Sequence, residues 1–443
     1  MFLLYNLFFL IFIFIYLPYF LLKGKYRQGA WMRLGFFSPS LLAKIKKPTI
    51  WLHAVSVGEI SSAVSLLNNL RKKYPEYQLV ISTVTTAGNR IAQQVASNKD
   101  LVVYLPYDLS FIVNKVIKKL SPQLFIILET EIWPNLISIL AKKKIPLLIV
   151  NGRISNKSFK KYQKIKFLLS SVLRKVNFYC MQTKEDSQRI ISLGAPREKV
   201  GITGNMKFDS EVPGDRYKKS DLGLKEENIL FVAASTHPGE EEIILEIYKQ
   251  IDRKNLRLLI APRHIERIPQ IEKLVQKQEL VTQRLSDFFI SLSADETMPA
   301  RDRERLFSDT TLSSSTILLL DTIGELSSLF GIADIVFVGG SLVKRGGHNI
   351  LEPAFFGKPI LFGRYMFNFQ EVAALFLQGK GAIVVDNAQE LKEAICNLLD
   401  NRGRREELGK RARQILEENR GATERNMEVI GRFMLKPVRN VTE

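Results

Sequence analysis

The sequence has 443 residues, of which 46% are apolar and 25% are charged, as in an ordinary globular protein. Since a single hydrophobic core rarely grows past about 250–300 residues, this length excludes one compact domain and predicts two. The 64 Lys and Arg against 45 Asp and Glu leave a formal net charge of +19. Such an excess favours an acidic partner: a nucleic acid, an anionic membrane or a phosphorylated substrate.

The first 22 residues carry no charge. As a helix they would extend about 33 Å at 1.5 Å per residue, enough for the roughly 30 Å hydrocarbon core of a bilayer. No basic residue precedes them, as one would in a secretory signal, whereas basic residues follow from Lys23 to Arg33. We therefore predict a membrane anchor helix over 1–22, with the rest of the chain on the anionic cytoplasmic side. Pro18 and Asn6 leave open a helix that lies in the membrane interface or in a protein core.

Cysteine and histidine show no spacing typical of a metal site. Cys180 and Cys396 stand far apart in apolar surroundings, which suits buried thiols in a reducing compartment. The histidines are His53, His237, His264 and His348. Because they form no HExxH or paired-Cys pattern, we predict no metal and no cofactor.

From Thr49 onward, short β-branched stretches alternate with amphipathic ones, the pattern of a parallel sheet covered by helices on both faces. The predicted strands cover residues 49–55, 78–84, 101–107, 123–129, 145–151, 177–182 and 199–204. The predicted helices cover residues 60–74, 111–120, 134–144 and 184–193. This pattern predicts a doubly wound, Rossmann-like α/β domain over residues 25–209.

Residues 210–227 are polar, contain Gly and Pro and lack periodicity, which predicts a linker. The alternation then restarts and predicts a second doubly wound, Rossmann-like domain over 228–403. Its predicted strands cover residues 228–236, 256–264, 316–321, 334–341, 359–363 and 382–386. Its predicted helices cover residues 239–251, 325–333, 350–356 and 388–399. Within it, 286–314 is polar and irregular, which predicts a surface excursion. Residues 404–443 form a C-terminal helical segment able to pack on either domain.

The unusual residues of this sequence follow the predicted strands. Ligands of open α/β sheets bind beyond the carboxyl ends of the strands. In the first domain, Glu59 follows the first strand, Glu129 and Glu131 follow the fourth, and Lys207 follows the last. In the second domain the same positions carry "APRH", "DTIGEL" and the glycine-rich "GGSLVKRGGHNILEP". This convergence favours one cleft between the domains.

Each feature alone has a simpler explanation. Glu59 at a helix start would interact with the positive end of the helix dipole, which is worth about 0.3–1 kcal/mol, the glycine pairs would form tight turns, and Lys207 would lie on the surface.

The second domain is a candidate nucleotide-binding domain. Free N–H groups at the helix start after His348 would bind a nucleotide phosphate. Because GxxxxGK[ST], an opening GxGxxG and Asp-x-Asp are missing, P-loop phosphoryl transfer and hydride transfer are disfavoured. A sugar-nucleotide transferase that holds the leaving phosphate with Arg and helix N-termini fits what remains.

These motifs resemble those of a known family. In order along the chain they are "HAVSVGE", "LPYDL", "ETEIWPN", "TGNMKFD", "STHPGEE", "APRH", "GELSSLFGIADIVFVGGS" and "RGGHNILEP". With the apolar start, they closely resemble the Kdo transferases of bacteria that have an outer membrane. Those enzymes move 3-deoxy-D-manno-octulosonic acid (Kdo) from CMP-Kdo to the lipid A precursor (lipid IVA) in lipopolysaccharide biosynthesis. The resemblance extends from the N-terminus to about Gly381.

The resemblance implies an inverting, metal-independent glycosyltransferase of the GT-B type, with two Rossmann-like domains that face a cleft. The first would bind the acceptor and the second CMP-Kdo. By resemblance, Glu59 of "SVGE" would be the catalytic base, and Glu129 of "ETE" and Lys207 of "GNMK" would stabilise the transition state. The CMP contacts implied in the same way are Pro262, Arg263, Ile323, Gly324, Glu325, Asn349, Ile350, Leu351 and Glu352.

The implied roles agree with the chemistry of the residues. A general base in reach of a hydroxyl contributes about 10²–10⁴-fold, and cations beside a departing phosphate stabilise its charge. An anchor would bring the enzyme to a lipid acceptor in the inner membrane. The apolar residues Trp31, Leu34, Phe36 and Phe37 are candidates to contact the acyl chains.

Three other functions remain open. One is a GT-B transferase that uses a UDP-sugar, and another is a catalytically inactive nucleotide-sugar sensor at the membrane. Nucleic-acid binding ranks last because the basic residues are dispersed and form no aromatic-interleaved run. The sequence leaves open the number of Kdo residues added, the later linkages, the acyl pattern of the acceptor and the oligomeric state.

Overall fold

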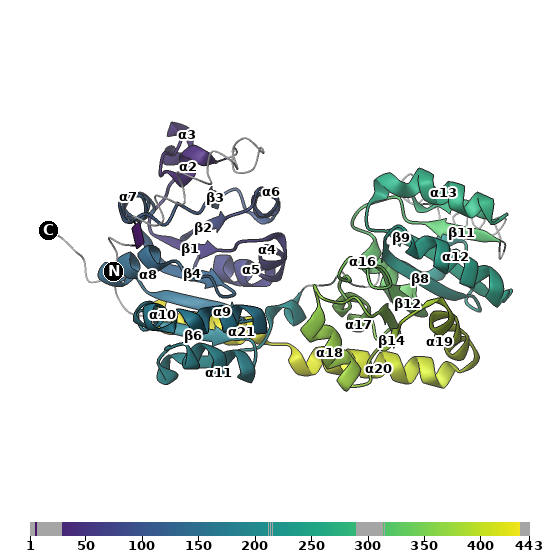
Figure 1. Ribbon diagram of the computed structural model, residues 1–443. Helices are drawn as coiled ribbons and strands as arrows, with labels where there is room; N and C mark the ends of the chain where they lie inside the picture. Colours follow the sequence, from purple (N-terminus) through teal and green to yellow (C-terminus); the bar gives the residue numbers. More distant parts are fainter. Residues whose placement is uncertain are drawn as a thin grey trace. The chain divides into compact units, whose positions relative to one another are not determined.

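The computed structural model describes residues 5–6, 29–210, 212, 214, 216–288, 313 and 315–434. They form two compact α/β units (Figure 1). Unit 1 comprises the chain up to Ser210 together with the residues from Asn419 onward, and unit 2 comprises Glu211–Glu418. Most of the predicted anchor 1–22 and of the predicted excursion 286–314 lies outside the described residues.

Unit 1 is built on a parallel sheet of seven described strands in the order β3-β2-β1-β4-β5-β6-β7. The strands are β1 (Thr49–His53), β2 (Gln78–Thr83), β3 (Leu101–Tyr104), β4 (Pro122–Leu128), β5 (Leu147–Gly152), β6 (Phe178–Met181) and β7 (Val200–Ile202). The strands predicted for this half are confirmed, with bounds shifted by a few residues. Because the strand order reverses between β1 and β4, the carboxyl ends of these two strands flank the topological switch point.

Helices cover both faces of this sheet. They are α2 (Ala30–Arg33), α3 (Pro39–Ala43), α4 (Val57–Ser62), α5 (Val64–Lys73), α6 (Thr86–Val95), α7 (Ser110–Leu120), α8 (Pro134–Lys142), α9 (Asn156–Lys164), α10 (Lys166–Leu173), α11 (Lys184–Ser192) and α21 (Ala422–Met434), with short 3-10 helices η1 (Arg197–Lys199) and η2 (Met206–Asp209). Successive side chains of a strand point to opposite faces. Trp51 of β1 therefore packs in one core with α7, α8 and α10, whereas Ile50 and Leu52 pack in the other with α4, α5 and α21.

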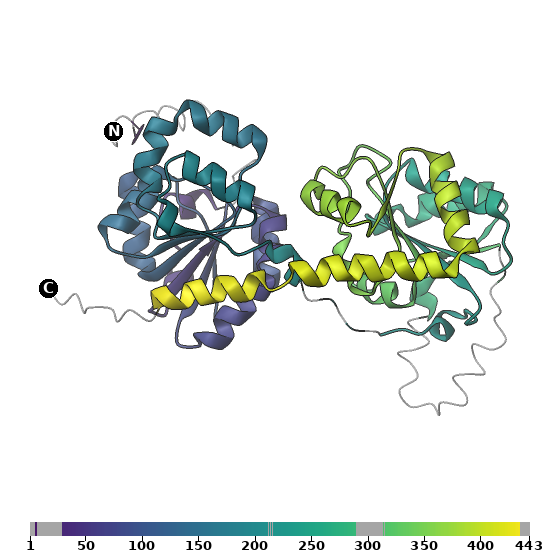
Figure 2. The same ribbon diagram turned by 90° about the horizontal axis from the view of Figure 1, so that it is seen from below.

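The C-terminal helix α21 belongs to unit 1. It packs against α5, β4 and β5 (Figure 2). Its apolar face, with Met427 and Ile430, is buried in the same core as β1. The segment predicted as 404–443 is thus divided between α20 (Arg402–Asn419), most of which lies in unit 2, and α21.

Unit 2 repeats the architecture with the strand order β10-β11-β9-β8-β12-β13-β14, again parallel. The strands are β8 (Ile229–Thr236), β9 (Leu256–Pro262), β10 (Val281–Arg284), β11 (Thr316–Leu319), β12 (Ile335–Val338), β13 (Ile360–Gly363) and β14 (Ile383–Val385). The helices are α12 (Glu240–Ile251), α13 (Ile268–Lys277), α16 (Leu326–Leu329), α17 (Leu351–Phe355), α18 (Gln370–Gln378), α19 (Ala388–Asp400) and α20, with 3-10 helices η3 (Lys219–Leu222), η4 (Ile265–Arg267) and η5 (Phe330–Ile332). Its switch point lies between β8 and β12.

One predicted helix and one strand show how the structure differs from the prediction. The helix predicted over 60–74 is two helices, because the chain breaks between α4 and α5 at Ala63. The second domain has an additional edge strand, β10, which the sequence pattern missed. Its sequence VTQR is largely exposed and pairs only with β11, so it lacks the alternating burial that marks a strand.

Two residues near the start of the chain contact unit 1. The Tyr5 hydroxyl donates to Asp108 Oδ2 at 2.9 Å, and the Asn6 Oδ1 accepts from Asn135 Nδ2 at 2.7 Å. Among the helices that the structure describes, none has the length and apolar character needed to cross a bilayer.

Candidate active site

Glu59 lies in the first turn of α4, directly after β1. Its Oε2 accepts from the backbone N–H of Val55 at 2.7 Å, and its Oε1 accepts from the Ser56 hydroxyl at 2.9 Å. The carboxylate thus reaches back over the start of α4, although the Ser56 side chain accepts no capping bond from the helix. The bonds from Val55 and Ser56 hold the carboxylate beyond the end of β1.

Glu129 and Glu131 follow β4, the strand beside β1. Burial raises the pKa of Glu59 to about 7, although its hydrogen bonds oppose this, and the charge of Glu129 raises it further. Burial and the charges of Glu59 and Glu129 likewise raise the pKa of Glu131 to about 7. Three carboxylates therefore gather at the switch point of unit 1, and two of them have a pKa suited to taking up a proton at neutral pH.

The backbone at Glu129 is strained. Its φ of 57° lies in the left-handed region, which costs a non-glycine residue about 1–3 kcal/mol. Strain of this kind persists only where the surrounding structure enforces it, and here its N–H donates to the Val150 carbonyl of β5 at 2.9 Å. The strained turn carries the chain from β4 into the loop that contains Glu131.

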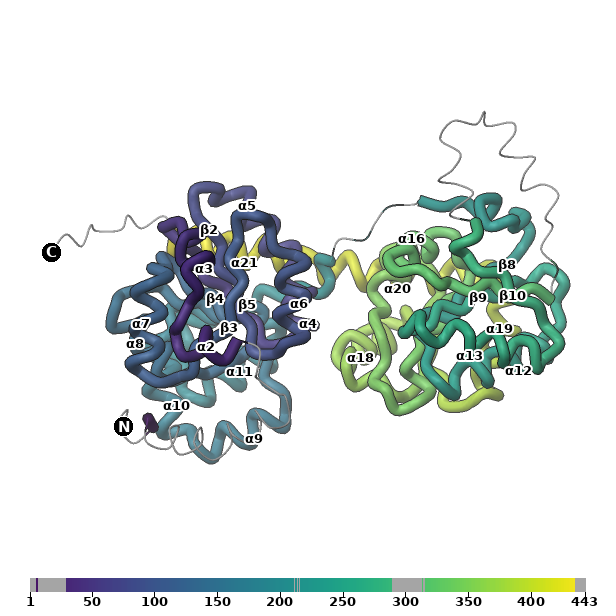
Figure 3. The backbone as a smooth tube through the Cα atoms, turned by 90° about the horizontal axis from the view of Figure 1, so that it is seen from above, coloured from purple at the N-terminus to yellow at the C-terminus, as the bar shows by residue number. Residues whose placement is uncertain are grey.

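Lys207 lies in a turn that approaches the helix of Glu59 from the other edge of the sheet. It lies in η2, which follows β7 and contacts α4, the helix that carries Glu59. The same helix α4 also lies beside α6 (Figure 3). The turn is held by Asn205, whose Oδ1 accepts from the Lys207 N–H at 3.0 Å, and by Asn151, whose Oδ1 accepts from the Met206 N–H at 3.0 Å. The chain after β7 thus folds back over the carboxyl ends of the sheet.

The sequence did not identify the residues that support this turn. Asn151 lies one residue before the end of β5, and its φ of 56° is in the left-handed region. Asp209, in the last position of η2, accepts from the backbone N–H groups of Gly421 at 2.7 Å and Thr423 at 2.5 Å, at the start of α21. Arg425 of α21 donates to the Thr203 carbonyl at 2.8 Å. The sequence indicated this turn only through short polar residues, such as Asn205 and Asp209, that follow a predicted strand.

The predicted apolar contacts divide into two pairs. Trp31 and Phe36 are 72% and 53% exposed, whereas Phe37 is buried in the core and Leu34 packs against it. Only the first pair has a side chain available to an acyl chain.

In unit 2, the predicted nucleotide contacts follow neighbouring strands. Pro262 ends β9 and is buried, and Arg263 after it is exposed. Ile323, 80% exposed, and Gly324 stand in the loop after β11, the strand next to β9. The next residue, Glu325, has a buried Oε2 with no hydrogen-bond partner among the described residues. A buried polar atom without a partner is costly, so this carboxylate is a candidate to receive a ligand hydroxyl.

The "NILE" residues form the start of α17. Asn349 Oδ1 accepts from the Leu351 N–H at 3.1 Å, and Asn349 Nδ2 donates to Glu352 Oε1 at 2.9 Å. Ile350 and Leu351 are buried in the core, so only their backbone groups could contact a nucleotide.

The glycine-rich turn after β12 is already occupied by a side chain. Glu240, fully buried, accepts from the backbone N–H groups of Gly340 at 2.7 Å, Ser341 at 3.0 Å and Leu342 at 3.0 Å. The N–H of Gly347 donates to the Gly340 carbonyl at 2.8 Å. These N–H groups are therefore not available to a phosphate. The α17 helix that follows His348 has five residues, and the N–H of its Leu351 is bonded to Asn349 Oδ1.

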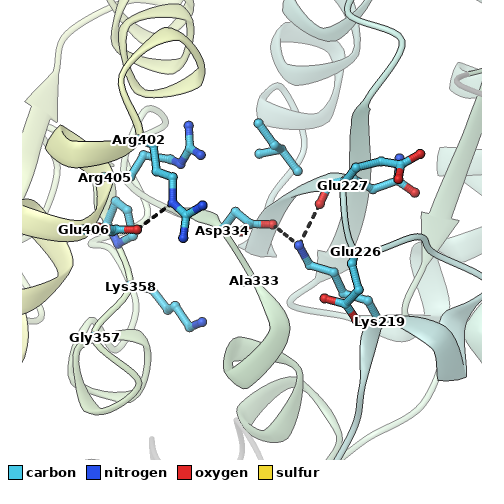
Figure 4. Close-up of a pocket in the computed structure, with 13 residues that line it drawn as sticks. Lys219, Glu226, Glu227, Ala333, Asp334, Gly357, Lys358, Arg402, Arg405 and Glu406 are labelled. Carbon is cyan, nitrogen blue, oxygen red and sulfur yellow. Dashed lines mark hydrogen bonds and ion pairs between the residues drawn. The ribbon is translucent and has the colours of Figure 1, made fainter.

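A cavity of about 450 Å³ lies at the opposite edge of the same sheet. It is lined by residues at the amino ends of β8, β12 and β13, among them Ile229, Asp334 and Pro359. Its charges pair with one another, as Lys219 with Asp334 at 2.8 Å and Arg402 with Glu406 at 2.7 Å (Figure 4). Because ligands of such sheets bind at the carboxyl ends of the strands, this cavity is not the candidate nucleotide site.

Comparison with known proteins gives a consistent result. Residues 28–210 match the family described as 3-deoxy-D-manno-octulosonic-acid transferase (kdotransferase), and residues 299–415 match the group 1 glycosyl transferases. The 3-deoxy-D-manno-octulosonic acid transferase of Haemophilus influenzae is 35% identical over 94% of this chain and 93% of its own. That of Chlamydophila psittaci is 29% identical over 93% of this chain and 90% of its own. A solved glycosyltransferase of Rickettsia africae, 13% identical, has a similar fold with a TM-score of 0.53 over 88% of this chain and 100% of its own.

Proposed function

The chain belongs to the 3-deoxy-D-manno-octulosonic acid (Kdo) transferase family, and we propose that it moves Kdo from CMP-Kdo to the lipid A precursor lipid IVA in lipopolysaccharide biosynthesis. The proposed reaction inverts the anomeric carbon and needs no metal ion, and the enzyme is proposed to be of the GT-B type. The observation that carries the proposal is the carboxylate cluster of unit 1, in which Glu59 has a pKa of about 7.

In the proposed reaction, Glu59 takes the proton of the acceptor hydroxyl. The hydroxyl oxygen then bonds to the anomeric carbon of Kdo, while the bond from that carbon to the phosphate oxygen breaks and its electron pair leaves with CMP. Lys207 provides positive charge near the Kdo carboxylate, and Arg263 provides it near the departing phosphate. Glu129 stabilises the positive charge that develops at the sugar. A single displacement with base and leaving group on opposite faces of the sugar inverts the centre.

We propose that the nucleotide contacts lie together at one edge of the sheet of unit 2. Arg263 and the loop with Ile323, Gly324 and Glu325 stand beyond neighbouring strands of unit 2, which supports a single binding edge. The unpartnered Glu325 oxygen supports a contact to a ribose hydroxyl. Pro262 borders this edge, and the start of α17, from Asn349 through Glu352, closes it on the far side of β8.

We also propose that the enzyme works at the cytoplasmic face of the inner membrane, held there by its apolar start. The bonds of Tyr5 and Asn6 to unit 1 favour an anchor that lies in the interface over one that spans the bilayer. The basic excess of the chain, +19, suits an anionic leaflet and an acceptor that carries phosphates.

A transfer assay tests the proposal. Purified full-length enzyme is incubated with lipid IVA and either CMP-Kdo or UDP-sugars, and the lipid products are weighed by mass spectrometry. The proposal predicts lipid IVA heavier by one or more Kdo residues with CMP-Kdo alone. Transfer from a UDP-sugar, or an acceptor of unchanged mass with CMP-Kdo, would contradict it.

A further inference from the structure

Two histidines share one proton site at the switch point of unit 2. The Nε2 atoms of His237 and His348 lie 2.9 Å apart, in rings that are nearly parallel. At this distance one Nε2 must donate and the other must accept, because two N–H groups would repel each other. His237 follows β8 and His348 lies in the loop after β12, so the pair stands between the two strands that flank the switch point.

Hydrogen bonds to Glu240 hold the backbone around the two histidines. The buried Glu240 carboxylate accepts from the backbone N–H of His237 at 3.0 Å and from the backbone N–H groups of the turn from Gly340 to Leu342. A Cβ on Gly340 would stand only 3.1 Å from His348 and 3.2 Å from His237, so this glycine leaves room for both rings. The hydroxyl of Thr236, the residue before His237, is buried and has no hydrogen-bond partner among the described residues. Buried hydrogen bonds to Glu240 therefore hold the backbone on which the two histidines stand.

Several basic side chains face the pair. Burial lowers the pKa of His237 below its usual range, and Arg345, His264, Arg267 and Arg263 lower it further. Burial likewise lowers the pKa of His348 to about 4, with contributions from His237, Arg263 and His264. Arg267 is paired with Glu241 at 2.6 Å, and the oxygens of Glu240 are engaged by backbone N–H groups. The pair is therefore uncharged at neutral pH.

A metal ion does not explain the cluster. Across the described ranges, no group of three or more His, Cys, Asp or Glu side chains is arranged to hold one. His264 stands 6.0 Å from His237 between ring centroids, edge to face. An anion fits this set better, because it would be attracted by the cations and would favour the charged form of the imidazoles.

We propose that His237 and His348 together take up one proton from solvent when the nucleotide donor binds, and that the protonated pair holds the phosphate that becomes the leaving group. Since one Nε2–H already joins the two rings, the added proton goes to Nδ1 of the donating ring, which gives an imidazolium hydrogen-bonded to a neutral imidazole. This inference rests on the proposed function. The proton stays on the pair while the bond from the sugar carbon to the phosphate oxygen breaks, and it returns to solvent when CMP leaves. The pair thus supplies the phosphate contact that the glycine-rich turn, occupied by Glu240, does not.

Calorimetry with a suitable ligand tests the inference. Cytidine 5′-(methyl phosphate) is the probe, because this diester, like the donor, carries one phosphate charge that does not titrate near neutral pH, whereas CMP itself does. Binding to the full-length enzyme is measured at pH 7 in two buffers of different ionisation enthalpy, which counts the protons taken up. We expect uptake of up to one proton. We also expect the affinity to fall as the pH rises from 6 to 8, by up to about tenfold per pH unit for one linked proton.

Variants assign the proton to the pair. His348→Gln and His237→Gln each keep a hydrogen-bonding side chain but remove the shared proton site, so both should bind without proton uptake and with little pH dependence. His264→Gln is the matched control, since it changes a neighbouring histidine outside the pair and should retain the uptake. Cytidine, which lacks the phosphate, should bind the unmodified enzyme without uptake.

The outcomes separate the two proposals. If the unmodified enzyme binds the diester without taking up a proton, or if both glutamine variants still take one up, the role of the pair is wrong while the nucleotide assignment stands. If the unmodified enzyme binds neither the diester nor CMP but binds UDP, the proposed donor is wrong and this inference fails with it.

Discussion

The two units share a topology, but the titratable groups at their switch points differ. In unit 1 the ends of β1 and β4 gather Glu59, Glu129 and Glu131, and burial with mutual repulsion raises the pKa of Glu59 and of Glu131 to about 7. In unit 2 the ends of β8 and β12 gather His237 and His348, whose pKa values are lowered by burial and by neighbouring arginines. In the proposed mechanism the same sheet architecture presents a proton acceptor in one unit and an anion site in the other, because the chemistry lies in the loops and not in the fold.

The largest expected effect comes from removing the base in unit 1. Glu59→Gln keeps the shape of the side chain and an oxygen that can accept from Val55 or Ser56, but it is not a base, so we expect the transfer rate to fall by about 10²-fold or more. The rate is measured by mass spectrometry of the lipid product at saturating donor. The matched control is Ser56→Ala, which removes the hydroxyl bonded to Glu59 Oε1 and should retain most of the activity. Turnover near the unmodified rate in Glu59→Gln would remove this residue from the mechanism.

Unit 2 should respond to Arg263→Ala by losing donor affinity. A hydrogen bond to a charged group contributes about 1.5–3 kcal/mol, so the KM for the donor should rise by about 10- to 100-fold. The effect is read from the transfer rate as a function of CMP-Kdo concentration. Arg411→Ala is the control, since this arginine pairs with Glu407 on the exposed side of α20. A donor KM equal to that of the control would show that Arg263 does not bind the nucleotide.

The pH dependence of transfer should follow the carboxylates of unit 1. Glu59 must be deprotonated to act as a base, so the rate should rise with pH through about 7 and then level off. The Coulomb interaction between Glu59 and Glu131 is reciprocal, so Glu131→Gln should lower the pKa of Glu59 and move the acidic limb to lower pH by about one unit or less. The measurement is the pH profile of kcat for both proteins. If the acidic limb of the Glu131→Gln profile lies at the same pH as that of the unmodified enzyme, the profile reports the titration of a group other than Glu59.

The smallest effect should be on the stability of unit 1. Asp209→Asn weakens two bonds to the start of α21, which should cost about 1–2 kcal/mol and lower the Tm by about 2–8 °C. Scanning calorimetry compares it with Asp400→Asn, which alters an exposed pair with Arg253 and should leave the Tm unchanged. Equal Tm values for the two variants would show that Asp209 does not hold α21.

The sequence predicted what depends on local pattern. The buried strands and the residues that follow them, such as Glu59 after β1 and Arg263 after β9, could be found because burial and strand ends leave a periodic signal. The edge strand β10 could not, since its exposed VTQR has one neighbour and no apolar face. The break at Ala63 also left no mark, because no proline or glycine is needed there. The functional roles of the site residues remain predictions for the experiments above.

The contacts that the sequence could not supply are those between distant residues. Glu240 lies within the motif "STHPGEE" at the start of α12, and it binds a turn 100 residues later in the chain. His237 and His348 are separated by 111 residues and meet only because β8 and β12 are neighbours in the sheet. Spacing in a single sequence does not report such pairs.

The division of labour between the units is tested most directly by calorimetric titration of CMP into three proteins: the unmodified enzyme, Glu59→Gln and Arg263→Ala. If unit 1 supplies the base and unit 2 holds the nucleotide, Glu59→Gln should bind CMP with the same Kd as the unmodified enzyme, and Arg263→Ala should bind it about tenfold more weakly or worse. Loss of CMP affinity in Glu59→Gln equal to that in Arg263→Ala would contradict this account.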